Sequence, residues 1–110
     1  MADECVFCDV VSGKFGTKFL YEDDLVVAFP DLRPMAPTHV LVVPRKHIAK
    51  LVDAIGDQVL LGRLLSVAGS VVKGGGGFRV VVNNGAEAGQ TVYHLHLHVL
   101  SGRHFAWPPG

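Results

Sequence analysis

The sequence predicts an α+β fold in which a mostly antiparallel sheet of five strands carries one short and one long helix. In the last predicted strand, 91–101, histidines alternate strictly with aliphatic residues from His94 to Val99, which is the two-residue period of a half-buried strand. One long stretch, 57–73, instead repeats its apolar residues every three or four positions, as an amphipathic helix does. Strands grouped apart from a single covering helix indicate α+β rather than βαβ units.

The beginning of the chain predicts a short helix followed by a hairpin. The apolar residues of segment 5–11 follow helical spacing, and Ser12 and Gly13 end this helix. Segments 19–21 and 25–29 flank an acidic turn, which is typical of two paired strands.

Two prolines, Pro34 and Pro37, predict a rigid connection after the hairpin, because proline fixes φ and has no N–H to donate. The next strand is expected at 39–43, where Pro44 closes it.

The middle of the chain predicts the long helix. Segment 46–55 is expected to be irregular or helical, and Gly56 and Asp57 then supply a break and an N-cap. The four glycines of 74–77 end the 57–73 helix. They do not predict a phosphate loop, because such a loop runs from strand to helix and carries Lys-Ser/Thr, whereas this run follows a helix.

The last third of the chain alternates strands with irregular segments. A strand is expected at 78–83, a loop at 84–90, and the histidine strand at 91–101. The tail, 102–110, ends in Trp-Pro-Pro-Gly, which is incompatible with a regular helix or a central strand.

Length and composition narrow the class of protein. A chain of 110 residues suits one domain, 1–110, with a flexible N-terminal segment at 1–4. Ten basic and ten acidic residues balance, so the chain lacks the charge needed to hold a nucleic-acid polymer, although one phosphate remains compatible with it. No apolar run approaches a bilayer span and the N-terminus lacks a basic signal region. We therefore expect no membrane partner and a cytoplasmic location, or a nuclear one in a eukaryote.

Three histidines on one strand face are the strongest functional feature of the sequence. Strand geometry places His94, His96 and His98 about 6.5–7 Å apart along the backbone. Each buried imidazole carries a donor and an acceptor that both need partners, so packing alone is a poor explanation. Two interpretations remain open: a zinc site with three histidine ligands and one water, or a nucleophilic histidine whose neighbours orient it toward phosphorus or an acyl carbon.

The only two cysteines, Cys5 and Cys8, are spaced for a metal rather than for an ordinary disulfide. Two thiolates supply half of a tetrahedral zinc site, which His47 and one of the strand histidines would complete. A redox pair is the alternative, but no strand precedes Cys5 as a thioredoxin-like motif requires. Cysteines without any such role are the third interpretation.

Several further residues have both a functional and a plain interpretation. Segment 89–91 brings backbone amides and a hydroxyl to the start of the histidine strand, as a phosphate needs, but it also suits an ordinary loop, and 83–85 is a turn signal. His39 opens a strand, and Asp31 suits either ribose hydroxyls or a surface turn. The apolar residues that suit either the core or a base pocket are Val6, Phe7, Val10 and Phe15.

Taken in order, these motifs resemble those of a known family. Pro-Thr-His at 37–39, Asn-x-Gly at 83–85, Gly-Gln-Thr-Val-Tyr at 89–93 and His-x-His-x-His at 94–98 resemble the histidine triad (HIT) superfamily, in particular the HINT branch of histidine triad nucleotide-binding proteins. The Trp-Pro-Pro-Gly ending points to that branch rather than to the diadenosine-polyphosphate branch. The resemblance extends from about Cys5 to the C-terminus, and its cysteine pair is similar to the zinc-containing members.

The resemblance implies a homodimer whose two sheets join into one, with tail 102–110 of each chain near the active site of its partner. It implies hydrolysis of purine nucleoside phosphoramidates, such as AMP joined to an amine, and possible action on acyl or aminoacyl adenylates. AMP, GMP and their phosphoramidates would be the partners, and no cofactor would be required for catalysis. The alternative is a purine nucleotide-binding or regulatory module with incidental hydrolysis.

The resemblance also assigns the catalytic set, His39, His94, His96 and His98. His96 would attack the α-phosphorus and form a nucleotidyl-histidine intermediate, while His98 and His39 would contact the phosphate and assist the leaving group. His94 would serve structure, as a ligand of a zinc ion held by Cys5, Cys8, His47 and His94.

The resemblance also implies which residues bind the nucleotide. The phosphate oxygens would be held by Asn83, Gly89, Thr91 and His98, and the ribose hydroxyls by Asp31. The purine would be surrounded by Val6, Phe7, Val10, Phe15, Phe29 and Leu32. Trp107 would lie on the dimer and leaving-group side of the site.

The chain departs from the family pattern at a few positions. Pro30 stands where a histidine is common beside the ribose aspartate, and segment 74–77 is unusually rich in glycine. His104 is open to two interpretations, a surface role or a contact with the leaving group across the dimer.

Overall fold

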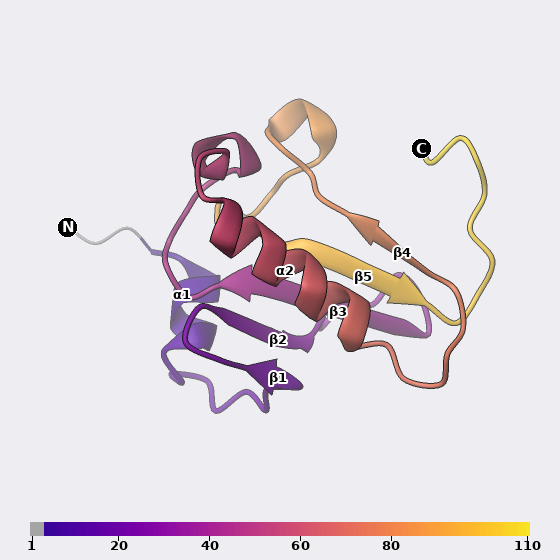
Figure 1. Cartoon of the computed structure of the whole chain (residues 1–110), viewed down its shortest axis with the longest axis horizontal. Helices are drawn as coiled ribbons and strands as arrows, with labels where there is room; N and C mark the ends of the chain where they lie inside the picture. The colour runs from indigo at the N-terminus through magenta and orange to yellow at the C-terminus, as the bar shows by residue number, and fades with distance from the viewer. Residues whose placement is uncertain (1–3) are drawn as a thin grey trace.

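A computed structural model describes residues 4–110; of the flexible end predicted at 1–4, residues 1–3 lie outside the described part of the chain. Five strands form one sheet in the order β1-β2-β3-β5-β4, with every neighbouring pair antiparallel (Figure 1). The strands are β1 (Tyr21–Glu22), β2 (Val26–Pro30), β3 (Thr38–Pro44), β4 (Phe78–Val81) and β5 (Leu97–Ser101). The helices are α1 (Val6–Val11) and α2 (Gln58–Ser70), with 3₁₀ turns at Leu51–Ala54 and Ala86–Ala88. The predicted α+β class with five strands is confirmed.

α2 covers one face of the sheet, in front of the strands in Figure 1. Asp57 begins the helix as expected, since its carboxylate accepts from the Leu60 N–H at 3.1 Å. The apolar stripe of α2 packs on alternate residues of β2, β3 and β5, which is why burial recurs every three or four positions in the helix and every two in the strands. The members of this core that are buried in α2 are Leu60, Leu64, Val67 and Ala68.

α1 covers part of the opposite face. Val10 packs there with the alternate strand residues Val27, Phe29, Leu41 and Val43. β2 and β3 are therefore buried on both sides where they cross the molecule, and their side chains that do not meet α2 point toward α1. This second face is the one that receives the histidines.

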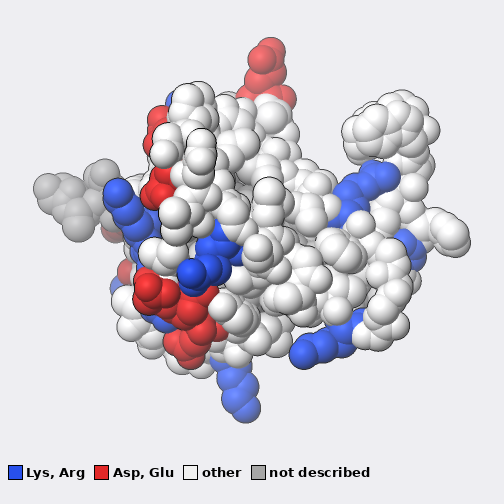
Figure 2. All heavy atoms as spheres, in the orientation of Figure 1, with Lys and Arg blue, Asp and Glu red and all other residues white. Residues whose placement is uncertain are grey.

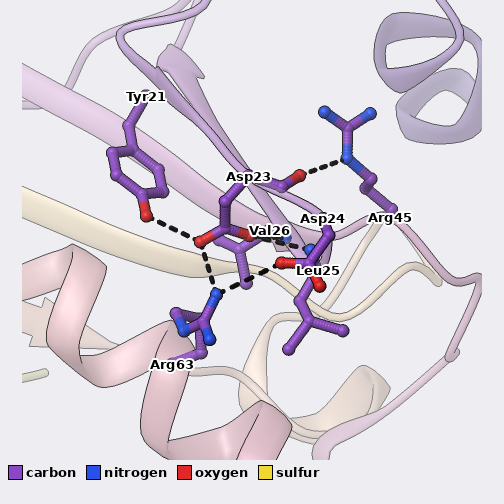
Figure 3. Close-up of polar contacts among 7 residues, drawn as sticks. All are labelled: Tyr21, Asp23, Asp24, Leu25, Val26, Arg45 and Arg63. Carbon is purple, nitrogen blue, oxygen red and sulfur yellow. Dashed lines mark hydrogen bonds and ion pairs between the residues drawn. The ribbon is translucent and has the colours of Figure 1, made fainter.

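A polar network joins the hairpin to α2 (Figure 3). The Asp23 carboxylate accepts hydrogen bonds from the Tyr21 hydroxyl at 2.6 Å, from the N–H groups of Leu25 and Val26 at 2.7 and 2.8 Å, and from Arg63 of α2 at 2.7 Å. Burial alone would raise the pKa of Asp23, but these donors hold it well below its usual range. One carboxylate thus fixes both the turn between β1 and β2 and the position of the helix.

The surface seen in Figure 2 has mixed charge. Acidic and basic side chains lie next to one another near the β1–β2 hairpin, where Glu22 pairs with Arg45 and Asp23 with Arg63, and most of the remaining surface of this face is uncharged. Within residues 4–110 no helix is both long and apolar enough to cross a bilayer.

Candidate functional site

The histidine strand is shorter than the sequence predicts. β5 begins at Leu97 rather than at residue 91, although Leu95 still joins Leu97 and Val99 in the core beneath α2. The pairing of Val42 with Leu97 would place Leu95 opposite Pro44, which has no N–H for the ladder. Leu95 instead donates its N–H to the Ile48 carbonyl at 2.6 Å. The segment before β5 therefore keeps its inside–outside alternation but not its strand pairing.

His96 is held in one tautomer by its own chain. Its Nδ1 lies 2.7 Å from the carbonyl oxygen of His94, and because a carbonyl only accepts, Nδ1 must carry the proton. Nε2 is then left with a free lone pair. Burial lowers the pKa of His96, and only 7% of the residue is exposed, so the ring is neutral near pH 7.

His39 and His98 form a second hydrogen-bonded arrangement, which gives His98 the tautomer opposite to that of His96. The N–H of Met35 donates to His39 Nδ1 at 3.0 Å, so the proton of neutral His39 resides on Nε2. That nitrogen lies 2.9 Å from His98 Nδ1 and 3.4 Å from the Asp31 carboxylate. His98 Nδ1 therefore accepts, and the proton of His98 resides on Nε2.

The charge state of this pair follows from its surroundings. Burial, and then the neighbouring His96 and His39, lower the pKa of His98 to about 4, and burial also lowers the pKa of His39. Asp31, His39 and His98 are close enough to hold a cation. However, the proton on His39 Nε2 occupies the nitrogen that would have to ligate it, so a hydrogen-bond relay explains this group better than a metal site.

These histidines line a cavity of about 690 Å³ between α1, the 29–35 segment and the start of β5. Its polar lining includes Asp31, His39, His96 and His98, together with Thr91. The rest of its wall is mainly apolar. All six residues predicted to surround a purine line it, namely Val6, Phe7, Val10, Phe15, Phe29 and Leu32. Leu32 and Phe15 are otherwise 96% and 56% exposed, which leaves them available to a ligand.

Two of the residues predicted to bind phosphate do not line this cavity. Neither Asn83 nor Gly89 is among the residues that line this cavity within the described part of the chain. The Gly89 N–H donates to the Ala86 carbonyl at 3.0 Å, and Gly89 has a left-handed φ of 99°, so here it closes a 3₁₀ turn. The structure thus unites Thr91 with the histidines, while the roles of Asn83 and Gly89 stay predictions.

Four metal-binding side chains meet beside the cavity. Cys5 Sγ and His94 Nδ1 lie 3.3 Å apart, as do Cys8 Sγ and His47 Nδ1, and Cys8 Sγ lies 3.5 Å from His94 Nδ1. Bonds of about 2.3 Å to sulfur and about 2.05 Å to nitrogen at a tetrahedral angle separate the two ligand atoms by about 3.5 Å. The donor set and its spacing therefore fit a tetrahedral zinc ion, with the members Cys5, Cys8, His47 and His94 that the sequence indicates.

The hydrogen bonding of His94 also suits a metal ligand. His94 is fully buried, and its Nε2 donates to the Pro44 carbonyl at 2.8 Å, which leaves Nδ1 free to ligate. Burial and the neighbouring Cys5 raise the pKa of Cys8 to about 11, which is opposite to the lowered pKa of a reactive redox thiol; ligation would require this thiol to lose its proton. The three triad histidines consequently do not share one centre: His94 faces the thiols, while His96 and His98 face the cavity.

Phe7 connects the two centres. It lies between the cysteines in sequence, and its ring packs edge-on against His96, with centroids 5.0 Å apart, and against His94 at 6.0 Å. The same ring contacts Phe29 across the cavity wall at 5.7 Å. α1 and its N-cap residue Cys5 therefore supply both thiols and part of the apolar side of the cavity.

The tail residues lie away from the cavity of their own chain. Trp107 is 82% exposed, and His104 lines a separate surface cleft with Arg79 and Arg103. Their predicted positions near the partner's site stay predictions.

Two contributions were missed by the sequence analysis. Leu41 lines the cavity, and its alternation with His39 on β3 was a signal that would have identified it. The backbone N–H of Met35, which sets the His39 tautomer, had no comparable signal because it depends on how the 31–37 connection folds back.

Comparison with known proteins agrees with this geometry. The model of the HIT domain family matches residues 13–105. An uncharacterized HIT-like protein of Synechocystis sp. is 48% identical over 114 residues, which cover 100% of both chains. The crystal structure of a HIT family hydrolase from Legionella pneumophila has 42% identity and a TM-score of 0.90, covering 97% of this chain and 100% of that one. A Zn-bound histidine triad family protein from Mycobacterium smegmatis has 33% identity and a TM-score of 0.81, covering 91% of this chain and 76% of that one. The chain belongs to the HIT domain family.

Proposed function

We propose that this protein is a hydrolase that cleaves purine nucleoside 5′-phosphoramidates through a nucleotidyl-histidine intermediate. The observation that carries the proposal is the opposite polarity of two adjacent imidazoles in one cavity. His96 presents a lone pair at Nε2, and His98 presents an N–H at Nε2. A nucleophile beside a hydrogen-bond donor is what displacement at phosphorus needs. The Legionella relative, which is described as a hydrolase, supports the same class.

In the proposed first step, His96 Nε2 attacks the α-phosphorus while the bond from phosphorus to the amine nitrogen breaks. The leaving nitrogen takes a proton from solvent and departs as an amine, and His98 donates a hydrogen bond to the phosphoryl oxygens. In the second step, water attacks the same phosphorus and returns a proton to solvent, the bond to His96 breaks, and AMP or GMP leaves. Splitting one displacement in two lowers the barrier of each, and no divalent cation takes part in either step.

The same cavity suits a nucleoside. Its apolar wall matches a purine in size and polarity. Asp31 uses Oδ1 to accept from the Arg33 N–H at 2.8 Å and directs Oδ2 toward His39, where ribose hydroxyls would donate to it. We propose Thr91 as a phosphate contact, and we keep Asn83 and Gly89 as predicted phosphate residues.

Replacing the nucleophile tests the proposal. We expect His96→Asn to abolish turnover of adenosine 5′-phosphoramidate, because an amide nitrogen has no free lone pair for attack, while AMP still binds. Rapid quench of the wild type with radiolabelled substrate should trap label on His96. Unchanged turnover in His96→Asn would contradict the mechanism. A wild type that binds AMP but turns over neither phosphoramidates nor acyl adenylates would instead support a nucleotide-binding or regulatory module.

We further propose that Cys5, Cys8, His47 and His94 hold a structural zinc ion. With all four positions taken by protein ligands, such a site is closed and contributes to folding rather than to chemistry. The Zn-bound relative from Mycobacterium smegmatis supports this assignment. Reduced thiols also suit the reducing cytoplasm, which we propose as the location of the protein.

Metal analysis tests the zinc proposal. We expect one zinc per chain in the wild type, loss of that zinc in Cys5→Ser, and a lower melting temperature because α1 is no longer tied to the sheet. Substituted cobalt should show the thiolate charge-transfer absorption of a tetrahedral sulfur site. Zinc retained in Cys5→Ser, or cobalt spectra without sulfur ligation, would contradict the assignment.

A further inference from the structure

The segment that follows β5 crosses directly over the connection between β2 and β3. Gly102 has a φ of +97°, and a Cβ placed on it would lie 2.7 Å from the side chain of Pro37. Only glycine permits both this backbone conformation and this approach. The next residue, Arg103, is thereby brought against the 31–37 connection.

Arg103 binds the backbone at that crossing. Its guanidinium donates to the Met35 carbonyl, with nitrogen–oxygen distances of 3.1 and 3.4 Å, and to the His104 carbonyl at 2.9 Å. Its planar group also stacks on Phe105, with the guanidinium carbon 4.3 Å from the ring centroid. Stacking and hydrogen bonding together hold the Arg103 guanidinium in one orientation.

Both backbone polar groups of Met35 form hydrogen bonds with side chains. Its carbonyl accepts from Arg103, and its N–H donates to His39 Nδ1 at 3.0 Å. Pro34 and Pro37 have no N–H, so between them only Met35 and Ala36 have backbone donors. The position of the Met35 backbone, together with the Asp31 carboxylate 3.4 Å from His39 Nε2, therefore decides which nitrogen of His39 is protonated.

We propose that Arg103 is a positioning residue for the cavity histidines, acting through Met35. With Met35 in place, His39 Nδ1 must accept, His39 Nε2 donates to His98, and His98 presents its N–H to the cavity. If Met35 shifts, His39 Nδ1 is free to take the proton, and Nε2 becomes an acceptor. His98 Nδ1 must then donate, which places a lone pair instead of a proton at His98 Nε2.

Arg79 provides a matched control. Its guanidinium carbon lies 5.2 Å from the centroid of the same Phe105 ring, and it donates to the Ala106 carbonyl at 3.0 Å. Arg79 thus holds the tail without touching Met35. Arg103→Met and Arg79→Met remove equal charge and leave similar apolar stems.

The direct test is ¹⁵N NMR of the imidazoles in the free protein near pH 7. We expect Arg103→Met to move the nitrogen shifts of His39 and His98 toward the other tautomer, Arg103→Lys to restore them in part, and Arg79→Met to leave them as in the wild type. Wild-type shifts in Arg103→Met, or equal changes in Arg79→Met, would overturn the proposal. Melting temperatures of the three variants show that each is folded.

The kinetic consequence rests on the proposed phosphoramidase activity. We expect kcat of Arg103→Met to fall about ten- to hundredfold, as for loss of one charge-assisted hydrogen bond, with the Kd for AMP within about twofold of the wild type. A wild type without turnover would contradict the proposed function, whereas the NMR result would still decide the role of Arg103. Full kcat in Arg103→Met together with altered tautomers would show that the relay does not serve catalysis.

Discussion

His96 and His98 lie two residues apart and face one cavity, yet they offer it opposite hydrogen-bonding groups. The difference does not come from the imidazoles but from what each Nδ1 meets: a carbonyl for His96 and the Nε2–H of His39 for His98. His94, the third member of the pattern, is turned to the thiols by its bond to Pro44. At the residue scale, the group that each imidazole presents is thus set by what its other ring nitrogen contacts rather than by side-chain type.

The low pKa of His98 makes stability depend on pH. Its pKa is about 4 in the folded protein against an ordinary 6.5, so between these values the unfolded chain binds a proton that the folded chain does not. This contribution to stability is complete above pH 6.5 and is lost as pH falls toward 4. We expect the free energy of unfolding in urea to decrease over this range, with a smaller decrease in His98→Asn.

NMR titration of the His98 ring provides the independent check. A ring that titrates near 6.5 in the folded protein would refute the assignment of His98 as a neutral, partly buried donor.

The hairpin and α2 show how elements are held together. The sheet face under α2 is apolar, so burial favours contact without specifying how the helix is oriented. Asp23 adds direction, because its carboxylate bonds the turn and Arg63 of the helix at once (Figure 3). Single carboxylates with several donors can therefore set the relation between elements that packing alone leaves loose.

Removing this carboxylate should cost stability. We expect Asp23→Ala to lower the free energy of unfolding by about 1–3 kcal/mol, because two N–H groups and Arg63 lose a charged acceptor. Glu22→Gln is the matched control, since its pair with Arg45 is exposed and should change stability by less than about 1 kcal/mol. Urea unfolding at pH 7 measures both. Equal effects of the two variants would show that Asp23 is no more than a surface charge.

At the scale of the whole molecule, two edges of the sheet are unpaired within residues 4–110. β1 has two residues, whereas β4 has four and begins at Phe78, which pairs with Ser101 just before the exposed tail. We propose that the homodimer forms through the β4 edge, because an unpaired edge strand is a template for a second strand.

The assembly can be measured by light scattering. We expect a mass of two chains for the wild type and a shift toward the monomer in Phe78→Lys, which places a charge on the proposed edge. Leu65→Lys adds the same charge to an exposed leucine of α2 and should leave the mass unchanged. A monomeric wild type, or dissociation in Leu65→Lys alone, would contradict the β4 interface.

The sequence predicted the number, order and type of the elements because their hydrophobic periods are local. The α2 stripe, the alternation at 94–99 and the proline connection all express spacing along the chain. Resemblance to a family also selected the metal-binding set and the cavity wall. The predicted length of β5 was wrong, because it depends on Pro44. This residue lies some fifty positions away, and its missing N–H ends the hydrogen-bond pairing of β5 with β3.

By itself, the sequence determined which residue types are available: alternating histidines, two thiols and an apolar helix face. Only the tertiary structure decided which imidazole nitrogen carries each proton, since the groups that decide it are the carbonyls of His94 and Pro44 and the N–H of Met35. Backbone groups are identical in every residue, so their partners are invisible in a sequence. They become specific only when the fold places them, and in this cavity they distinguish the Nε2 lone pair of His96 from the Nε2–H of His98.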